Sequence, residues 1–110
     1  MKKVYIAGKL NAGACDYIKN VHAMILAGDQ IRRMGHSVFL PCLDLLSGLV
    51  MGNMEYEDYF ENNIPWLKVA DFLYVMPCSE NSSGTQAEIK IAKLRDIPII
   101  TDINFFRGIL

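Results

Sequence analysis

Hydroxyl, amide and carboxylate groups lie close together in the segment Ser82–Glu88, which reads SSGTQAE. The segment separates an apolar run from a helical pattern, so it is expected to form the N-terminus of a helix. Free N–H groups at such a terminus bind phosphate or carboxylate. A glutamate in the first turn can act as a nucleophile or a base. The candidate catalytic residue is Glu88, and the candidate binding residues are Ser82, Ser83, Gly84 and Thr85.

The same spacing also has a purely structural interpretation. Thr85-x-x-Glu88 matches a capping box, in which the Glu88 side chain only binds the backbone of Thr85. Ser83-x-x-Gln86 matches the same pattern. Spacing alone favours the cap and leaves the catalytic role as the alternative.

A second candidate region follows the first expected strand, KVYIA. Gly8-Lys9 resembles the start of a phosphate loop, but neither GxxxxGK[ST] nor GxGxxG is present. Gly8 is instead expected to allow a sharp turn, which would bring Lys9 or Asn11 near a ligand. Tyr5 lies inside the strand and is either a core aromatic residue or part of the site.

The elements that must position these residues alternate along the chain. Strand patterns occur at 3–7, 37–40, 72–76 and 97–101, and helical patterns occur at 16–34, 55–70 and 85–95. This alternation predicts an α/β fold: a small doubly wound parallel sheet of four to five strands with helices on both faces, similar to Rossmann or flavodoxin folds. Ligands bind such sheets beyond the carboxyl ends of the strands. That rule selects the loops 8–15, 41–53 and 77–84.

Several local features carry their own expectations. The first helix should begin at an Asp16 cap, end before Gly35, and bury one stripe of residues: Ile18, Val21, Ile25 and Gly28. Residues 41–54 are expected to be irregular, and Pro65 should kink or split the second helix. The apolar residues 45–54 and the tail FFRGIL are expected to leave exposed apolar surface, which favours a homo-oligomer.

Composition bounds the remaining possibilities. The chain has 110 residues and is expected to be one domain over 1–110, with a net charge of −1 that excludes the basic surface typical of nucleic-acid polymer binding. No apolar run reaches the roughly 18 residues of a membrane span, so the protein is expected to be cytoplasmic. Three cysteines without a CxxC pair, and two isolated histidines, indicate reduced thiols and no metal site. No cofactor is expected.

Four ordered segments resemble the nucleoside 2-deoxyribosyltransferase superfamily, including its small members and the deoxynucleoside 5′-monophosphate N-glycosidases. They are VYIAG at Val4–Gly8, GHSVFLP at Gly35–Pro41, WLKVADFLYVMP at Trp66–Pro77 and SSGTQAEIKIAK at Ser82–Lys93. The resemblance extends over nearly the whole chain and reverses the preference for a capping role of Glu88.

The resemblance implies cleavage of the bond between a nucleobase and C1′ of deoxyribose. Glu88 matches the glutamate that attacks C1′ and forms a covalent sugar ester, by the logic of retaining glycosidases. Tyr5 matches a tyrosine that positions this glutamate. Ser82 matches the serine that contacts the 5′-phosphate in the monophosphate hydrolases. The segment that begins with Gly8 and contains Lys9 and Asn11 matches the stretch along the nucleotide. A neighbouring subunit is expected to complete the site.

Asn63 departs from the pattern, because members with demonstrated catalysis carry an aspartate at this position. An asparagine forms hydrogen bonds but neither supplies nor takes a proton as a carboxylic acid does. Asp58 or Glu61 would replace that aspartate only if the helix turned one of them inward. The leading hypothesis is an N-glycoside-cleaving enzyme acting on a nucleoside or its 5′-monophosphate. The alternatives are a non-catalytic nucleotide-binding module and a small structural or interaction protein.

Overall fold

The computed structural model describes residues 1–10, 14–52 and 56–109, and its centre is a parallel sheet of four strands. The strands are β1 (Lys3–Ala7), β2 (Ser37–Phe39), β3 (Phe72–Val75) and β4 (Ile99–Ile100). They lie in the order β2-β1-β3-β4, and Tyr5 of β1 is in register with Phe39 of β2 and Leu73 of β3.

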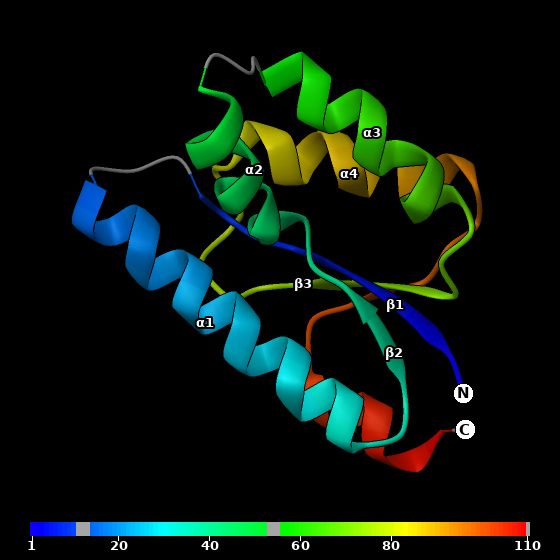
Figure 1. Ribbon diagram of the computed structural model, residues 1–110. Helices are drawn as coiled ribbons and strands as arrows, with labels where there is room; N and C mark the ends of the chain where they lie inside the picture. Colours follow the sequence, from blue (N-terminus) through cyan, green and yellow to red (C-terminus); the bar gives the residue numbers. More distant parts are fainter. Residues whose placement is uncertain (11–13, 53–55, 110) are drawn as a thin grey trace.

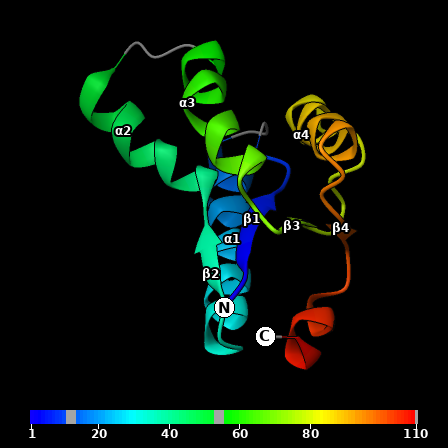
Figure 2. The same ribbon diagram turned by 90° about the vertical axis from the view of Figure 1, so that its right-hand side faces the viewer.

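Alternate residues of β1 point to the two faces of the sheet, as the pleat requires. Val4 and Ile6 pack in one buried cluster with α1 (Ala14–Arg33) and with the C-terminal 3-10 helix η2 (Ile103–Gly108). Tyr5 and Ala7 pack in the opposite cluster, with α3 (Tyr56–Lys68) and α4 (Ser83–Leu94). Figures 1 and 2 show these two layers of helices on either side of the sheet.

The doubly wound α/β fold predicted from the sequence is confirmed. The chain leaves β1 toward β2 through α1, and it leaves β3 toward β4 through α4 on the other face. The strand order therefore reverses between β1 and β3, which is where such sheets bind ligands.

The predicted buried stripe of α1 is wrong in part. Ile18 and Ile25 are exposed, and the residues that face the sheet are Val21, Met24, Ala27, Gly28 and Ile31. The small residues lie on this face because the chain just after β2 comes close: a Cβ added at Gly28 would lie 3.1 Å from the Leu40 side chain. The start of α1 also differs, since Asp16 lies inside the first turn rather than at the cap. The predicted end is confirmed, with Gly35 at φ +99° just beyond the helix.

The middle of the chain is more regular than predicted. Residues 41–51 form the 3-10 helix η1 (Pro41–Leu43) and the helix α2 (Asp44–Met51). The helix α3 continues through Pro65 without a split. Ile64 and Leu67 on either side of the proline are buried against the sheet, and this packing holds the last turn in place.

The exposed apolar tail expected from FFRGIL is found only in part, since Phe105 is 40% exposed. The tail forms η2, and Phe106 is completely buried beneath the sheet between Tyr74 and His36. The buried His36 ring lies 2.9 Å from the Phe106 carbonyl oxygen through Nε2, while Nδ1 lies 3.3 Å from the Lys2 backbone nitrogen. Since Nδ1 accepts from Lys2, Nε2 carries the proton and donates to Phe106. These contacts attach the C-terminal segment to the start of β1 and β2.

Candidate functional site

A cavity of about 450 Å³ opens at the carboxyl ends of β1, β2 and β3. Its volume lies in the range of small-molecule sites. The three segments that follow these strands all contribute to its wall, together with α3 and α4. Seven of the ten predicted site residues line it: Tyr5, Gly8, Asn63, Ser82, Gly84, Thr85 and Glu88.

Glu88 lies in the second turn of α4, so the predicted capping box is wrong. The helix begins at Ser83, and the cap is Ser82, whose Oγ accepts a hydrogen bond from the backbone N–H of Thr85 at 3.2 Å. The Glu88 carboxyl group is therefore left to the cavity. Burial raises the pKa of Glu88 from 4.5 to about 7, against the opposing effect of a hydrogen bond with Tyr5.

Tyr5 connects the central strand to this carboxyl group. The residue is buried, and its ring stacks on Phe39 with centroids 5.4 Å apart. Phe39 in turn stacks on Trp66 of α3 at 5.7 Å. The tyrosine is thus held between strands and helix, and its hydrogen bond favours the ionised form of Glu88.

The N-terminus of α4 presents polar groups to the same cavity. Ser82 accepts from Thr85 and keeps its hydroxyl proton for a further partner. Gly84 in the first turn also lines the cavity, so the positive end of the helix dipole adjoins the ligand space. The Thr85 residue is only 1% exposed, and its Oγ1 has no hydrogen-bond partner within the described part of the chain.

Two of the predicted residues that the structure describes, Lys9 and Ser83, do not line the cavity. The Ser83 side chain is exposed, since helical geometry turns it away from Glu88. Lys9 lines a second hollow on the α1 side, and its backbone N–H donates to Ser79 Oγ at 3.0 Å. Asn11 lies outside the described residues. Gly8 lines the cavity, but it does not have a positive φ. A glycine is required at this position because the Met76 side chain lies close: an added Cβ would be 3.0 Å from Met76 Cβ and 2.8 Å from Met76 Cγ.

Asn63 faces the cavity from α3 and does not act alone. It is 5% exposed, and its Nδ2 donates to Oδ2 of Asp44 at 2.6 Å. Asp44 is the first residue of α2, and it lines the cavity as well. Asp58 and Glu61 are exposed and are not among the residues that line it.

Asp44 is the functional candidate that the sequence analysis missed. The sequence did carry one signal for it. Residues 41–53 follow a strand at the edge of the sheet where ligands are expected to bind, and Asp44 is the only carboxylate in that segment. The tyrosines Tyr17 and Tyr59 and the α2 residues Leu45 and Leu49 also line the cavity, and none of them was predicted as a site residue.

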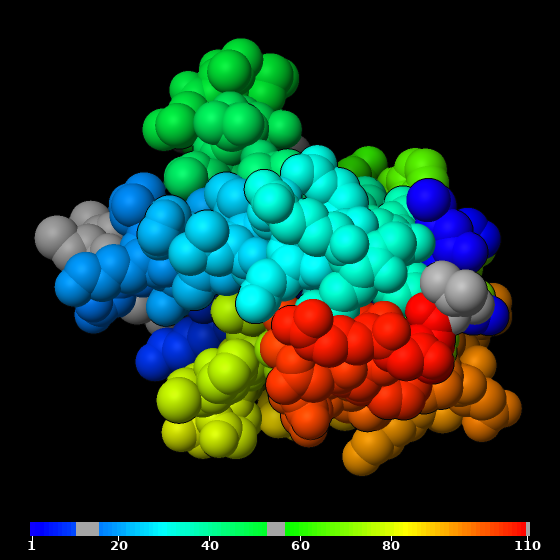
Figure 3. Space-filling view, turned by 90° about the horizontal axis from the view of Figure 1, so that it is seen from below, coloured from blue at the N-terminus to red at the C-terminus, as the bar shows by residue number. Residues whose placement is uncertain are grey.

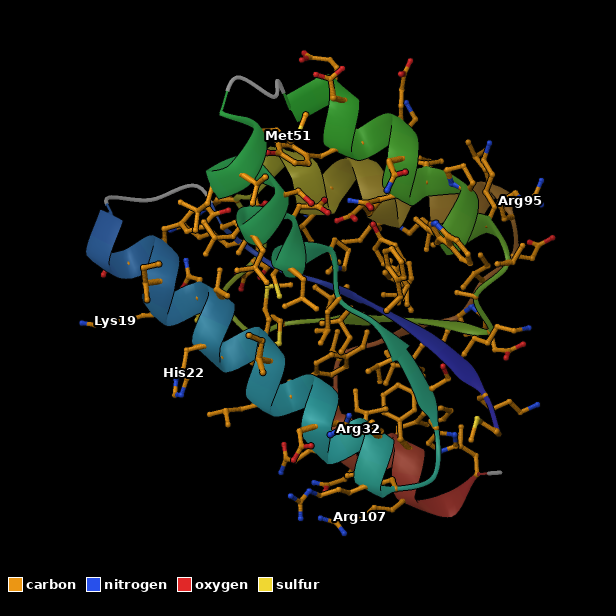
Figure 4. All side chains as sticks on the ribbon, in the orientation of Figure 1. Lys19, His22, Arg32, Met51, Arg95 and Arg107 are labelled. Atoms are coloured by element: carbon orange, nitrogen blue, oxygen red, sulfur yellow. The ribbon has the colours of Figure 1, made fainter. Side chains whose placement is uncertain are left out.

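The cavity has an acidic and apolar character. Among the described residues that line it, none is lysine, arginine or histidine. Lys19, Arg95 and Arg107 lie at the periphery of the molecule (Figure 4). Burial raises the pKa of the Cys42 thiol to about 11, so this thiol stays protonated at neutral pH. The described part of the chain holds no group of three or more His, Cys, Asp or Glu residues suited to a metal ion.

None of the helices in the described ranges has the length and apolar character required to cross a bilayer. A search of curated proteins found no match to the sequence.

Solved structures that share this fold include the following two. The first is a 2-deoxyribosyltransferase from the psychrotolerant bacterium Bacillus psychrosaccharolyticus, with a TM-score of 0.70 and 20% identity over 98% of this chain and 92% of that protein. The second is a conserved protein from Enterococcus faecalis V583, with a TM-score of 0.62 and 19% identity over 90% of this chain and 61% of that protein. At these identities the likeness establishes the deoxyribosyltransferase-like fold.

The family is established by the sequence itself. Residues 2–101 match a family described as a domain of unknown function, DUF4406. Within the described part of the chain, that span includes the four strands, the helices α1 to α4 and the residues that line the cavity. The chain therefore belongs to the DUF4406 family.

Proposed function

We propose that the protein cleaves, or transfers sugar across, the N-glycosidic bond of a nucleoside or its 5′-monophosphate. The observation that carries this proposal is the pair formed by Glu88 and Tyr5. A carboxyl group hydrogen-bonded to a rigidly held tyrosine borders a cavity of nucleoside size at the switch point of the sheet. The shared fold with a 2-deoxyribosyltransferase supports the same chemistry.

In this reaction a Glu88 oxygen attacks C1′ of the sugar, and the C1′–nitrogen bond breaks with its electron pair going to the base. The transition state resembles an oxocarbenium ion, so the anionic carboxylate next to C1′ stabilises it. Water or a second base then attacks C1′ and releases Glu88. Tyr5 positions the carboxylate and favours its ionised form. No cofactor is required for these steps.

Polar groups at the start of α4 would bind the sugar or its phosphate. Ser82, Gly84 and Thr85 border the cavity there, next to the positive end of the helix dipole. Because no basic side chain is among the described lining residues, amides and hydroxyls would supply the recognition of a phosphate.

The test is base release. The protein is incubated with deoxynucleosides, ribonucleosides and their 5′-monophosphates, and free base is measured by chromatography. Wild type should release base from at least one substrate, and Glu88→Gln should not. Equal release by both proteins, or release by neither, would contradict the proposal.

A non-catalytic nucleotide-binding module is the second candidate. Asn63 favours it, since this side chain cannot act as an acid. Thermal-shift measurements separate the two functions, because a binding module would be stabilised by a nucleotide that it does not cleave.

We also propose that the chain forms a homo-oligomer through α2. Figures 2 and 3 show α2 projecting from the body of the molecule, and its Leu46, Leu49, Val50 and Met51 side chains are 61–83% exposed. Exposed apolar surface of this kind is typical of an interface. Light scattering should give a mass above that of one chain, and a Leu46→Glu/Val50→Glu variant should give the mass of one chain.

A further inference from the structure

We infer that Asp44 is the general acid and base of the proposed reaction, and that Asn63 is its positioning residue. The inference rests on the proposed function and adds a second carboxylate to it. Asp44 and Glu88 are the two carboxylates among the described residues that line the cavity. Glycosidic cleavage commonly uses such a pair, one group at C1′ and the other for the proton.

The position of Asp44 is fixed by three features. It is the first residue of α2, and Pro41 and η1 lead directly into it from β2. The buried Asn63 amide donates to Oδ2 at 2.6 Å and so selects one orientation of the carboxyl group. Among the described residues no hydrogen bond to Oδ1 is found, so this oxygen is available to a substrate. The strand order places β1, with Tyr5, between the segment after β2 and the segment after β3. The two carboxylates therefore approach the cavity from opposite sides.

The proton balance closes over two steps. In the first, Glu88 forms a bond to C1′, the C1′–nitrogen bond breaks, and the protonated Asp44 gives its proton to the departing base. In the second, Asp44 as carboxylate takes a proton from water, the water oxygen bonds to C1′, and the bond from C1′ to Glu88 breaks. Both carboxyl groups return to their starting states.

This assignment explains why an asparagine can occupy position 63. The asparagine does not donate the proton, but it binds the group that does. A positioned acid or base contributes about 10²–10⁴-fold to rate. Asp44→Asn keeps the shape and a hydrogen-bond acceptor, and it removes only the transferable proton.

Leaving groups separate this role from a structural one. Ordinary deoxynucleosides need a proton on the base, whereas 7-methyl-2′-deoxyguanosine and 4-nitrophenyl 2-deoxyriboside release a stable leaving group without one. Asp44→Asn should lose about 10²–10⁴-fold in kcat on ordinary deoxynucleosides and much less in glycosyl-enzyme formation from the activated donors. The rate of glycosyl-enzyme formation is measured from the burst of leaving-group release in the first turnover. Glu88→Gln should be inactive on both kinds of donor.

Asn63→Ala should lower kcat on ordinary deoxynucleosides by roughly tenfold, with KM nearly unchanged, since only the orientation of Asp44 is lost. The exchanged variant Asp44→Asn/Asn63→Asp returns a carboxyl group to the same hydrogen-bonded pair and should recover part of the activity. Glu61→Gln, an exposed acid on α3, is the matched control and should behave as wild type.

The outcomes are distinct. Wild-type activity with equal losses for Asp44→Asn on all donors, or with no loss, would overturn the role of Asp44 and leave Glu88 in place. Absence of base release by wild type from any donor would overturn the proposed function and the role of Asp44 together.

Discussion

Glu88 keeps its proton in the folded protein over a pH range in which an unfolded chain releases it. Its pKa is raised from 4.5 to about 7 by burial. Near pH 4 the carboxyl group is mostly protonated in both the folded and the unfolded protein, so it has little effect on the free energy of unfolding. As the pH rises toward 7 the unfolded chain ionises first, so the free energy of unfolding falls. Above about pH 7 the free energy of unfolding falls no further, and the total decrease is up to about 3 kcal/mol.

Glu88→Gln should therefore stabilise the protein in a pH-dependent way. The variant and wild type should be about equally stable near pH 4, and the variant should be more stable by up to about 3 kcal/mol at pH 8. Urea unfolding at the two pH values measures the difference. A stability difference that does not change with pH would contradict the raised pKa.

Thr85 provides a second prediction at the scale of one residue. A buried hydroxyl without a partner costs about 1–3 kcal/mol, and Oγ1 of Thr85 is in this state among the described residues. Thr85→Val should raise the free energy of unfolding of the ligand-free protein by about 1 kcal/mol. It should also weaken nucleoside binding by about tenfold, since the ligand loses a hydrogen bond.

Thermal unfolding and calorimetric titration measure the two effects of Thr85→Val. The exposed Thr101→Val is the control and should change neither quantity. Loss of stability in Thr85→Val without weaker binding would show that the hydroxyl is structural.

Glu88 and Tyr5 were predicted as site residues from the family resemblance, since spacing alone favoured a cap for Glu88 and left Tyr5 open, and both residues line the cavity. The sequence could not identify the hydrogen bond between Asn63 and Asp44, which joins side chains 19 residues apart in the chain. Such a contact depends on how α2 and α3 meet, and local periodicity carries no information about that. The roles of these residues stay predictions until the variants are measured.

At the scale of elements, the contact between α2 and α3 is close. A Cβ added at Gly48 of α2 would lie 2.7 Å from the hydroxyl oxygen of Tyr59 on α3. Both residues line the cavity. The glycine weakens α2 as a helix, by about 1 kcal/mol relative to alanine, but lets the two helices approach.

Gly48→Ala should move α2 or Tyr59 and weaken nucleoside binding by about tenfold, because overpacking costs about 1–3 kcal/mol. Calorimetric titration measures the change. Ser47→Ala, an exposed position on the same helix, is the matched control and should leave binding unchanged. Unchanged binding in Gly48→Ala would show that the cavity does not depend on this approach.

The elements themselves were predictable where one pattern dominates. The strand β3 is a continuous apolar run, and Gly35 ends α1 as predicted. The buried face of α1 was misplaced because its inward positions include Ala27 and Gly28, whose small side chains give little hydrophobic signal. The helix α2 was missed because two glycines lie among its apolar residues and just after it, at Gly48 and Gly52.

At the scale of the whole molecule, the alternation of strands and helices was enough to predict the doubly wound sheet, because connections in such folds are right-handed and short. The position of the tail was not predictable. The tail packs against the sheet through Phe106, and His36 contacts both Phe106 and Lys2. Only the folded chain brings these residues together.

The helix α2 has no buried residue, although it supplies one wall of the cavity and the carboxylate of Asp44. Segments with so little buried contact open and close without unfolding the rest of a protein. In deuterium exchange by mass spectrometry, amides of residues 45–51 should exchange well before those of residues 21–31 in α1. A bound nucleoside should slow the first group. This wall of the cavity would then be a separate local folding unit, which becomes ordered when a ligand binds.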